Sequence, residues 1–380
     1  MKLTITRHEL NDAVQQVSKA VAQRTAIPIL SGIKLEAAYA GITFTASDSD
    51  ISIQSFVPLE TADRTIATIE RPGSIVLPAK FLVEMVKKLP GEQVHIEVGE
   101  RFQTMIRSGS TDIQLAGLDP EEFPVLPSIA EDVMISVPGN LLRDMIHQTV
   151  FAVSTNESSP VLTGILWNLE EGLFKFIATD RHRLAKSTVT VEAADTRFSN
   201  IVVSGKTLSE LSKLIPDQDA IVDIIVSDNQ VLFKLENVLF YSRMLDGLYP
   251  DTSKIIPSAF KTELVLDTRL LSEAIDRAYL LSREEKTNIV RLITMEDGRS
   301  IEISSSSSEI GRVTEQLEPI SLTGDPLRIA FNSRFMLDAL KVIDSEELFI
   351  GFTGAMSPII IRPRDNDHSL HLILPYRTAN

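Results

Sequence analysis

Residues 42–52, ITFTASDSDIS, decide the fold because the same pattern occurs twice more in the chain. The segment aligns without gaps with FKFIATDRHRL at 174–184 and with IEISSSSSEIG at 301–311. Each copy opens with apolar residues at every second position, which is typical of a strand with one buried face. Self-similarity of this kind predicts a chain built from three copies of one structural unit.

Each of these strands lies between two segments in which apolar residues have the spacing of a helix that buries one stripe. The upstream stripes are Leu10, Ala13, Val14, Val17 and Val21; Leu142, Met145, Ile146 and Val150; and Leu271, Ala274, Ile275 and Ala278. The downstream segments are KFLVEMVKKLP from Lys80, KTLSELSKLIP from Lys206 and RFMLDALKVI from Arg334. Three sets of charged residues correspond in them: Lys80, Lys206 and Arg334; Glu84, Glu210 and Asp338; Lys87, Lys213 and Lys341. The sequence therefore predicts an α+β fold with two amphipathic helices among short strands in each copy.

Two loops rich in Pro and Gly separate the copies. They are GLDPEEFPVLP, which ends at Pro127, and DGLYPDTSKIIP, which ends at Pro257. We therefore predict domains at 1–127, 128–257 and 258–380. The alternative is that short amphipathic segments of an ordinary α+β protein match by chance, but agreement in order, spacing and charge favours a repeat.

Composition excludes several classes of protein. The chain has 380 residues, a formal net charge of −15 and no cysteine, so disulfide scaffolds, thiol nucleophiles and thiolate metal sites are excluded. The absence of cysteine fits a reducing cytoplasm, and no apolar stretch is long enough to cross a membrane. We therefore expect a cytoplasmic protein without membrane contact.

Positive charge is concentrated on the six predicted helices. They carry 14 Lys and Arg against 8 Asp and Glu, a net of +6, so the rest of the chain carries −21. Helices gathered on one side of the sheets would present a basic surface that attracts phosphate without reading sequence. The plainer interpretation is that Lys and Arg are good helix formers on a solvated face. Recurrence of Lys87, Lys213 and Lys341 favours DNA, and the scarcity of aromatic residues favours duplex over single strands.

The strongest enzyme-like motif is IVVSGKT at 201–207, in which a strand leads into Gly205-Lys206-Thr207 as in a phosphate-binding P-loop. The full motif needs a second glycine where Asn200 stands, and the other two copies share only the basic residue. A nucleotide-dependent enzyme that uses this turn is the alternative to a DNA-binding protein.

Other polar clusters have ordinary explanations. Asp48 and Asp50 could form a pair of catalytic carboxylates, but their counterparts in the other copies predict a solvated turn instead. His368 and His371 lack the further ligands that a metal site needs. TDRHRLA at 179–185 differs from its repeat partners in its charge, so it is either an exposed turn or a site.

Six motifs together carry a family resemblance. They are RTAIPILSGI at 24–33, FAVSTNESSPVLTGILW at 151–167, ATDRHRLA at 178–185, YPDTSKIIP at 249–257, FTGAMSPIIIRP at 352–363 and LILPYR at 372–377. Over its whole length the chain resembles the bacterial DNA polymerase III beta subunit, the sliding clamp. The resemblance implies a processivity factor, not an enzyme, that works without cofactor or metal. It implies three clamp domains per chain, with helices inside and antiparallel sheets outside, in a head-to-tail homodimeric ring around duplex DNA.

The resemblance also implies partners and sites. The DNA polymerase III alpha subunit, the clamp loader and repair polymerases would bind through short peptides. The implied pocket for these peptides consists of Leu162, Thr179, His182, Arg183, Leu184, Pro250, Ile255, Leu372, Leu374, Pro375 and Arg377. Tyr376 stands where members often carry Met, and the loop 156–161 lacks the aromatic pair that some relatives use to contact DNA.

Two further sets of residues complete the predicted sites. DNA contact is implied for Arg24 by its matching position, and is predicted from charge and repeat for Lys80, Lys87, Lys206, Lys213, Arg334 and Lys341. At the dimer interface the resemblance implies that Ile113 of one copy meets Leu280 and Leu281 of the other.

Overall fold

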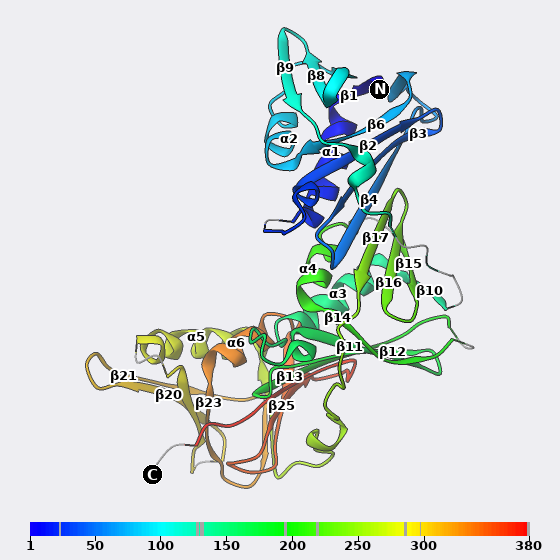
Figure 1. Cartoon of the computed structure of the whole chain (residues 1–380). Coiled ribbons are helices and arrows are strands. Elements are labelled where there is room, and N and C mark those ends of the chain that lie inside the picture. The colour runs from blue at the N-terminus through cyan, green and yellow to red at the C-terminus, as the bar shows by residue number, and fades with distance from the viewer. Residues whose placement is uncertain are drawn as a thin grey trace. The chain divides into compact units, whose positions relative to one another are not determined.

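The computed structural model describes residues 1–22, 24–126, 129, 133–193, 196–217, 220–284, 287–296 and 298–377. The chain forms two compact units, Met1–Asn140 with Glu210–Met244, and Leu141–Ser209 with Leu245–Asn380. Within the described residues no helix has the length and apolar character needed to span a membrane. Both units are built from antiparallel sheets with helices packed against them (Figure 1).

The first unit contains a five-stranded sheet of order β5-β1-β7-β8-β9 and an eight-stranded sheet of order β10-β15-β16-β17-β4-β3-β2-β6. Its strands are β1 (Lys2–Thr6), β2 (Gly32–Ala38), β3 (Gly41–Ser47), β4 (Ile51–Pro58), β5 (Ala67–Arg71), β6 (Gly73–Pro78), β7 (Gln93–Val98), β8 (Gln103–Ser108), β9 (Thr111–Ala116), β10 (Met134–Pro138), β15 (Ile221–Val226), β16 (Gln230–Leu235) and β17 (Val238–Arg243). Helices α1 (Arg7–Val17) and α2 (Ala79–Val86) pack on each other, and α1 also covers β3 and β4.

The second unit contains a nine-stranded sheet of order β14-β11-β12-β13-β26-β25-β24-β18-β22 and a four-stranded sheet of order β21-β20-β19-β23. Its strands are β11 (Gly164–Glu170), β12 (Leu173–Thr179), β13 (Arg183–Thr190), β14 (Phe198–Ser204), β18 (Thr262–Asp267), β19 (Ile289–Thr294), β20 (Ile301–Ser307), β21 (Gly311–Leu317), β22 (Ser321–Gly324), β23 (Arg328–Asn332), β24 (Glu347–Phe352), β25 (Ile359–Pro363) and β26 (Ser369–Ile373). Helices α5 (Thr268–Glu284) and α6 (Ser333–Leu340) pack side by side. The division between the units falls inside α3 (Gly139–Val150) and α4 (Gly205–Ser212).

Both large sheets run across the predicted copies. In the first unit β17, from the second copy, pairs with β4 from the first, so that Phe240 lies opposite Ile53. In the second unit β26, from the third copy, pairs with β13 from the second, so that Leu372 lies opposite Leu184. The second copy therefore contributes strands to both compact units, and the units do not coincide with the sequence copies. The domain boundaries stay a prediction, and Pro127 lies outside the described residues.

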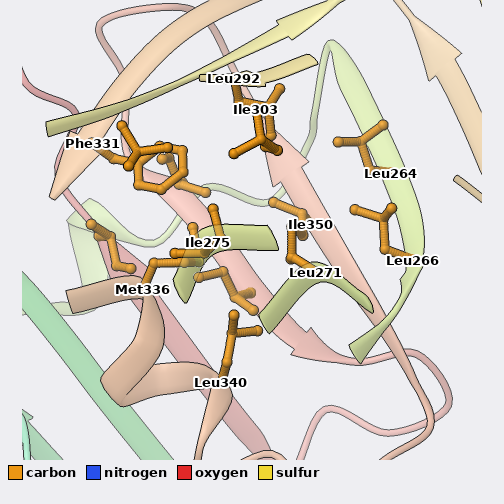
Figure 2. Packing of buried hydrophobic residues seen from close by; sticks show 14 of the residues in the cluster. Leu264, Leu266, Leu271, Ile275, Leu292, Ile303, Phe331, Met336, Leu340 and Ile350 are labelled. Carbon is orange, nitrogen blue, oxygen red and sulfur yellow. The ribbon is translucent and has the colours of Figure 1, made fainter. Parts of the chain in front are cut away.

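The predicted apolar stripes form the cores. Leu271, Ala274, Ile275 and Ala278 on α5 are buried. Leu271 and Ile275 belong to one core cluster with the β-strand residues Leu292 and Ile350 (Figure 2). In α1 the predicted stripe is buried as far as Val17, where the helix ends. A short 3-10 turn, Ser18–Ala20, follows, so Val21 lies beyond the helix, contrary to the predicted stripe.

Candidate functional site

A tight turn follows the repeated strand in all three copies, and in the second copy it supports a cavity. Asp180 Oδ1 accepts hydrogen bonds from the backbone N–H groups two and three positions on, at 2.9 and 3.0 Å. Asp48 does the same at 3.0 and 2.8 Å, and Ser307 Oγ at 3.3 and 3.3 Å. Asp48 Oδ1 thus closes a turn that all three copies build, in agreement with the turn predicted from the aligned copies.

Arg183 ties the turn of the second copy to helix α6 of the third. Its Nε donates to Asp180 Oδ2 at 3.0 Å and its Nη1 donates to Asp338 Oδ2 at 2.7 Å. The guanidinium lies over the ring of Phe335 at 4.5 Å and near that of Phe151 at 5.4 Å. Two carboxylates and two rings hold this largely buried cation in place.

A cavity of about 450 Å³ opens beside this arginine, within the second unit. Its lining residues are Val153, Ser154, Thr155, Asn156, Ser159, Leu162, Asp180, Arg181, His182, Arg183, Asn288, Asn332, Arg334 and Phe335. Three of the residues predicted for the peptide pocket, Leu162, His182 and Arg183, line it. The ring of His182 faces that of Phe335, with 6.4 Å between centroids. The volume suits one or two side chains of a peptide.

The other predicted pocket residues divide by burial. Leu184 and Leu372 are 1% exposed and pack on Ile360, so they support the surface from beneath. Ile255 and Leu374 are 44% and 39% exposed and can be reached from solvent. The remaining predictions also divide: Thr179 is buried, Pro375 is half-buried, and Pro250 and Arg377 are exposed.

Tyr249 is a buried support that the sequence analysis did not single out. Its hydroxyl accepts a hydrogen bond from the Thr179 N–H at 3.1 Å and donates to the Gly164 carbonyl at 3.4 Å. Burial raises the pKa of this hydroxyl, which therefore stays protonated as a donor. Leu162 packs against the same ring in a small apolar cluster. The motif YPDTSKIIP contains this tyrosine, but only the fold shows which backbone groups it joins.

The segment after β26 is held at both ends by backbone hydrogen bonds. The Leu374 N–H donates to the His182 carbonyl at 2.9 Å, and the Tyr376 N–H donates to the Ala330 carbonyl at 2.7 Å. Leu374 therefore keeps an exposed apolar side chain beside the turn of the second copy, and Tyr376 is exposed beside β23. The last three residues of the sequence, which follow Arg377, lie outside the described residues.

The seven cations predicted to contact DNA are all exposed. Arg24, Lys80, Lys87 and Lys213 belong to the first unit, and Lys206, Arg334 and Lys341 to the second. Lys87 Nζ lies 3.2 Å from Glu84 Oε1, and Lys213 Nζ lies 2.7 Å from Glu210 Oε1. Lys87 and Lys341 are also the C-caps of α2 and α6, where a cation complements the helix dipole. The recurrence of these lysines therefore has a structural reason too, and their contact with DNA stays a prediction.

The P-loop interpretation fails on the local backbone. Strand β14 ends at Ser204 and α4 begins at Gly205, so no loop separates strand from helix to wrap a phosphate. A Cβ at Gly205 would stand 3.0 Å from Val153 Cγ2, so close packing explains the glycine. Thr207 is buried, which withdraws its hydroxyl from any bound ion.

The predicted dimer residues lie on one edge strand and on helix α5. Ile113 is half-buried on β9, the last strand of the five-stranded sheet. Leu280 is exposed and Leu281 half-buried in the last turns of α5. Helix α5 packs on β20 and β21, and β21 is itself the edge of the four-stranded sheet.

His371 on β26 is buried and has no hydrogen-bond partner at either ring nitrogen. Its ring packs on Phe151, with 5.6 Å between centroids. Burial lowers its pKa to about 4, from an ordinary value of 6.5, so the neutral ring is the folded form. Together with exposed His368, it belongs to no metal-ligand cluster in the described part of the chain.

This histidine gives a stability prediction. The unfolded chain takes up a proton below pH 6.5, whereas folded His371 resists protonation down to about pH 4. The free energy of unfolding should therefore fall by about 3 kcal/mol between these pH values on account of this residue. A His371→Leu variant should lack that part of the fall, as urea unfolding at pH 7 and pH 4.5 would show. Equal pH dependence in the two proteins would contradict the prediction.

Comparison with known proteins agrees with this architecture. Three family models match: the N-terminal domain of the DNA polymerase III beta subunit at residues 1–127, the central domain at 136–251 and the C-terminal domain at 253–377. The beta sliding clamp of Bacillus subtilis (strain 168) is 50% identical over 378 residues, covering 100% of both chains.

Solved structures agree as well. The crystal structure of the Bacillus subtilis DNA polymerase sliding clamp superposes with a TM-score of 0.97 at 49% identity, covering 100% of both chains. The DNA polymerase III beta chain of Streptococcus pneumoniae TIGR4 gives 0.95 at 34% identity, covering 99% of this chain and 100% of its own. The fold is thus that of a sliding clamp with three domains. The chain belongs to the DNA polymerase III beta subunit family.

Proposed function

We propose that two copies of this chain close head to tail into a ring around duplex DNA, where the ring tethers a replicative polymerase. In this role the protein binds and does not catalyse, and the reducing cytoplasm predicted from the lack of cysteine is where it would work. The observation that carries the proposal is the way in which strands pair between copies of the repeat.

The same strand pairing between neighbouring copies occurs twice within the chain, and the first and third copies each keep one strand of this kind unpaired. The last strand of the second copy, β17, pairs with β4 of the first, and the last strand of the third copy, β26, pairs with β13 of the second. By the repeat, β9 of the first copy and β21 of the third are the corresponding unused strands, and both are sheet edges. Pairing β9 with β21 of another chain would complete the series, and a heterologous contact of this kind can close into a ring.

The internal junctions also predict the register of this seam. Ile53 lies opposite Phe240 at one junction, and Ala185 lies opposite His371 at the other. The strand pairings within each copy place Val313 and Ile113 at the corresponding positions of β21 and β9. Both residues are apolar, half-buried and on the core face of their strands, so the predicted register places one apolar side chain opposite another. Leu280 and Leu281 of α5 would complete the apolar contact.

A cysteine pair tests this register. Asp112 and Thr314 fall opposite each other on the outer face, and the chain has no cysteine of its own to interfere. We expect a variant with Asp112→Cys and Thr314→Cys to form a covalent dimer on oxidation, because facing residues bring their Cβ atoms to within about 5.5 Å. The measurement is a non-reducing denaturing gel.

The matched control carries Asp112→Cys with Val313→Cys. A shift by one residue turns the second thiol to the other face of the sheet, so this variant should stay unlinked. Efficient linking of the control, or no linking of the first variant at concentrations where dimer is present by sedimentation, would refute the proposed seam.

Duplex DNA is the partner that the helices support. We propose that Arg24, Lys80, Lys87, Lys206, Lys213, Arg334 and Lys341 face the DNA in the ring. The first turns of α2, α4 and α6 carry Lys80, Lys206 and Arg334, and the residues that directly follow these helices are Lys87, Lys213 and Lys341; Arg24 lies beyond α1. Such exposed cations offer weak contacts to phosphate, and the predicted helices carry few aromatic side chains for stacking on single-stranded bases. Weak contacts suit a ring that slides, because enclosure rather than affinity keeps it on the DNA.

The pocket of the second unit is proposed to bind peptides. Leu374 offers exposed apolar contact next to His182, which lines the cavity beside Arg183, and Ile255 is a further exposed apolar residue of the proposed pocket. The buried residues of the set, Leu162, Leu184 and Leu372, would hold this surface rigid. A short peptide with Leu or Phe anchors fits such a surface. Such peptides would come from the DNA polymerase III alpha subunit, the clamp loader and repair polymerases.

A further inference from the structure

We propose that Phe81 of one copy packs on Ile310 of the other at each seam of the ring. This contact rests on the head-to-tail ring proposed above and adds to it a third apolar element, besides Ile113 with Val313 and the two leucines of α5. It would stand where the junction inside the chain has the contact between a phenylalanine ring and an arginine.

The junction between the second and third copies provides the template. There, the ring of Phe335 on α6 lies under the guanidinium of Arg183 at 4.5 Å, and Asp338, one turn further along α6, pairs with the same group at 2.7 Å. Arg183 stands at the end of the turn that leads into β13, and α6 also contacts β26. The helix of one copy thus covers the turn of the copy before it, next to the paired strands.

The repeat identifies the residues that would meet at the seam. Phe81 follows Lys80 as Phe335 follows Arg334, and Glu84 takes the place of Asp338. On the other side, Ile310 is the third residue after Ser307, as Arg183 is the third after Asp180, and both donate their backbone N–H to that turn oxygen. Ile310 directly precedes β21, whereas Arg183 is the first residue of β13, because the turn of the third copy is one residue longer: Ser305 pairs with Val313 where Ala178 pairs with Ala185. A phenylalanine would therefore face an isoleucine where the template has a phenylalanine and an arginine.

Both side chains are left uncovered in the single chain. Phe81 is 61% exposed and Ile310 is 58% exposed, whereas their counterparts Phe335 and Arg183 are partly covered by each other. In the template an arginine pairs with Asp338, but at the seam Ile310 would replace that arginine. Glu84, the counterpart of Asp338, is not left unpaired, because it already forms an ion pair with Lys87. We assign a second copy of the chain as the partner that covers these side chains, because Phe81 and Ile310 would flank the two free strand edges, β9 and β21, of the proposed seam.

A double-mutant cycle on the dimer tests the contact. We expect Phe81→Ala and Ile310→Ala each to raise the dimer dissociation constant about 100-fold, because dissociation breaks two seams and each loses the burial of a large apolar group. The double variant should be little worse than either single variant, since the pair is already lost. The measurement is sedimentation equilibrium over a dilution series. If Phe81→Ala gives only monomer, the milder variant Phe81→Leu is used in the cycle instead.

A control variant and a salt test show whether the effect is specific to this apolar contact. Ile221→Ala removes an equally exposed residue, 55%, from β15 of the second copy and should leave the dimer unchanged. The coupling energy between Phe81 and Ile310 in dimer formation should be unchanged at 1 M NaCl, because salt screens charges and does not weaken apolar contacts. Thermal unfolding of each variant checks that the fold is kept.

The outcomes separate this inference from the ring itself. If the Asp112 and Thr314 cysteines link but the effects of Phe81→Ala and Ile310→Ala simply add, or match those of Ile221→Ala, the contact is refuted and the ring stands. If the cysteines do not link, the seam itself fails, and the proposed contact fails with it.

Discussion

On a nicked circular duplex the dimer should remain bound after a rise in salt that removes it from the same DNA cut once. A closed ring can leave the circle only by opening, whereas on the linear form it slides off an end. If the seven predicted cations held the protein by contact alone, affinity would fall about 1,000-fold or more between 50 and 200 mM salt on both forms. Gel filtration of labelled protein with each DNA at both salt concentrations makes the measurement.

The cysteine pair at Asp112 and Thr314 provides the control for this experiment. Oxidation of both seams on the circle should make retention survive denaturation, and a later cut in the DNA should release the protein. Retention that is equal on circular and linear DNA would show binding by contact and would contradict enclosure.

The sequence predicts the units of this fold better than their connections. The three-residue and four-residue spacing of Leu271, Ile275 and Ala278 identifies the buried face of α5, because a helix that packs on a sheet needs one apolar stripe. The end of α1 was predicted four residues too late, because a 3-10 turn at Ser18–Ala20 follows without a break in the apolar pattern.

The pairing of β17 with β4 and of β26 with β13 could not be predicted from the residues alone. Alternation of apolar residues tells which face of a strand is buried, but it does not tell which edge the strand meets. Once the fold shows two such junctions, however, the repeat extends them to the seam between chains.

In the candidate site, too, contacts between residues near in sequence could be predicted, whereas contacts between residues far apart in sequence could not. The polar turn at Asp180 was predicted from the three aligned copies, and its hydrogen bonds span only two and three residues. Arg183 was singled out by its motif, yet its partner Asp338 lies 155 residues away, and no spacing rule connects the two. The supporting roles of Phe335, Phe151 and Tyr249 were missed for the same reason.

Removal of Leu374 to Arg377 should abolish binding of a polymerase-derived peptide and leave the dimer intact. The segment carries the exposed Leu374, whose N–H is bonded to the cavity-lining His182, and the exposed Tyr376. It is attached through two backbone hydrogen bonds, so its loss costs the fold little. Loss of a central apolar anchor typically weakens binding by 2 kcal/mol or more, about 30-fold. Fluorescence anisotropy of a labelled peptide measures the affinity, and sedimentation checks the dimer. An unchanged peptide affinity would remove the pocket assignment.

The first unit supplies a matched control for that experiment. At the equivalent junction Arg243 takes the place of Leu374, and its N–H donates to the Asp50 carbonyl at 2.9 Å. The cavity there, of about 270 Å³, is smaller than that of the second unit, and Arg243 lines it together with Tyr241 and Val125. A peptide with an apolar anchor would meet the charged Arg243 where the second unit offers Leu374, so it should choose the second unit. Arg243→Ala should therefore leave its affinity unchanged, and each chain should bind one peptide at saturation.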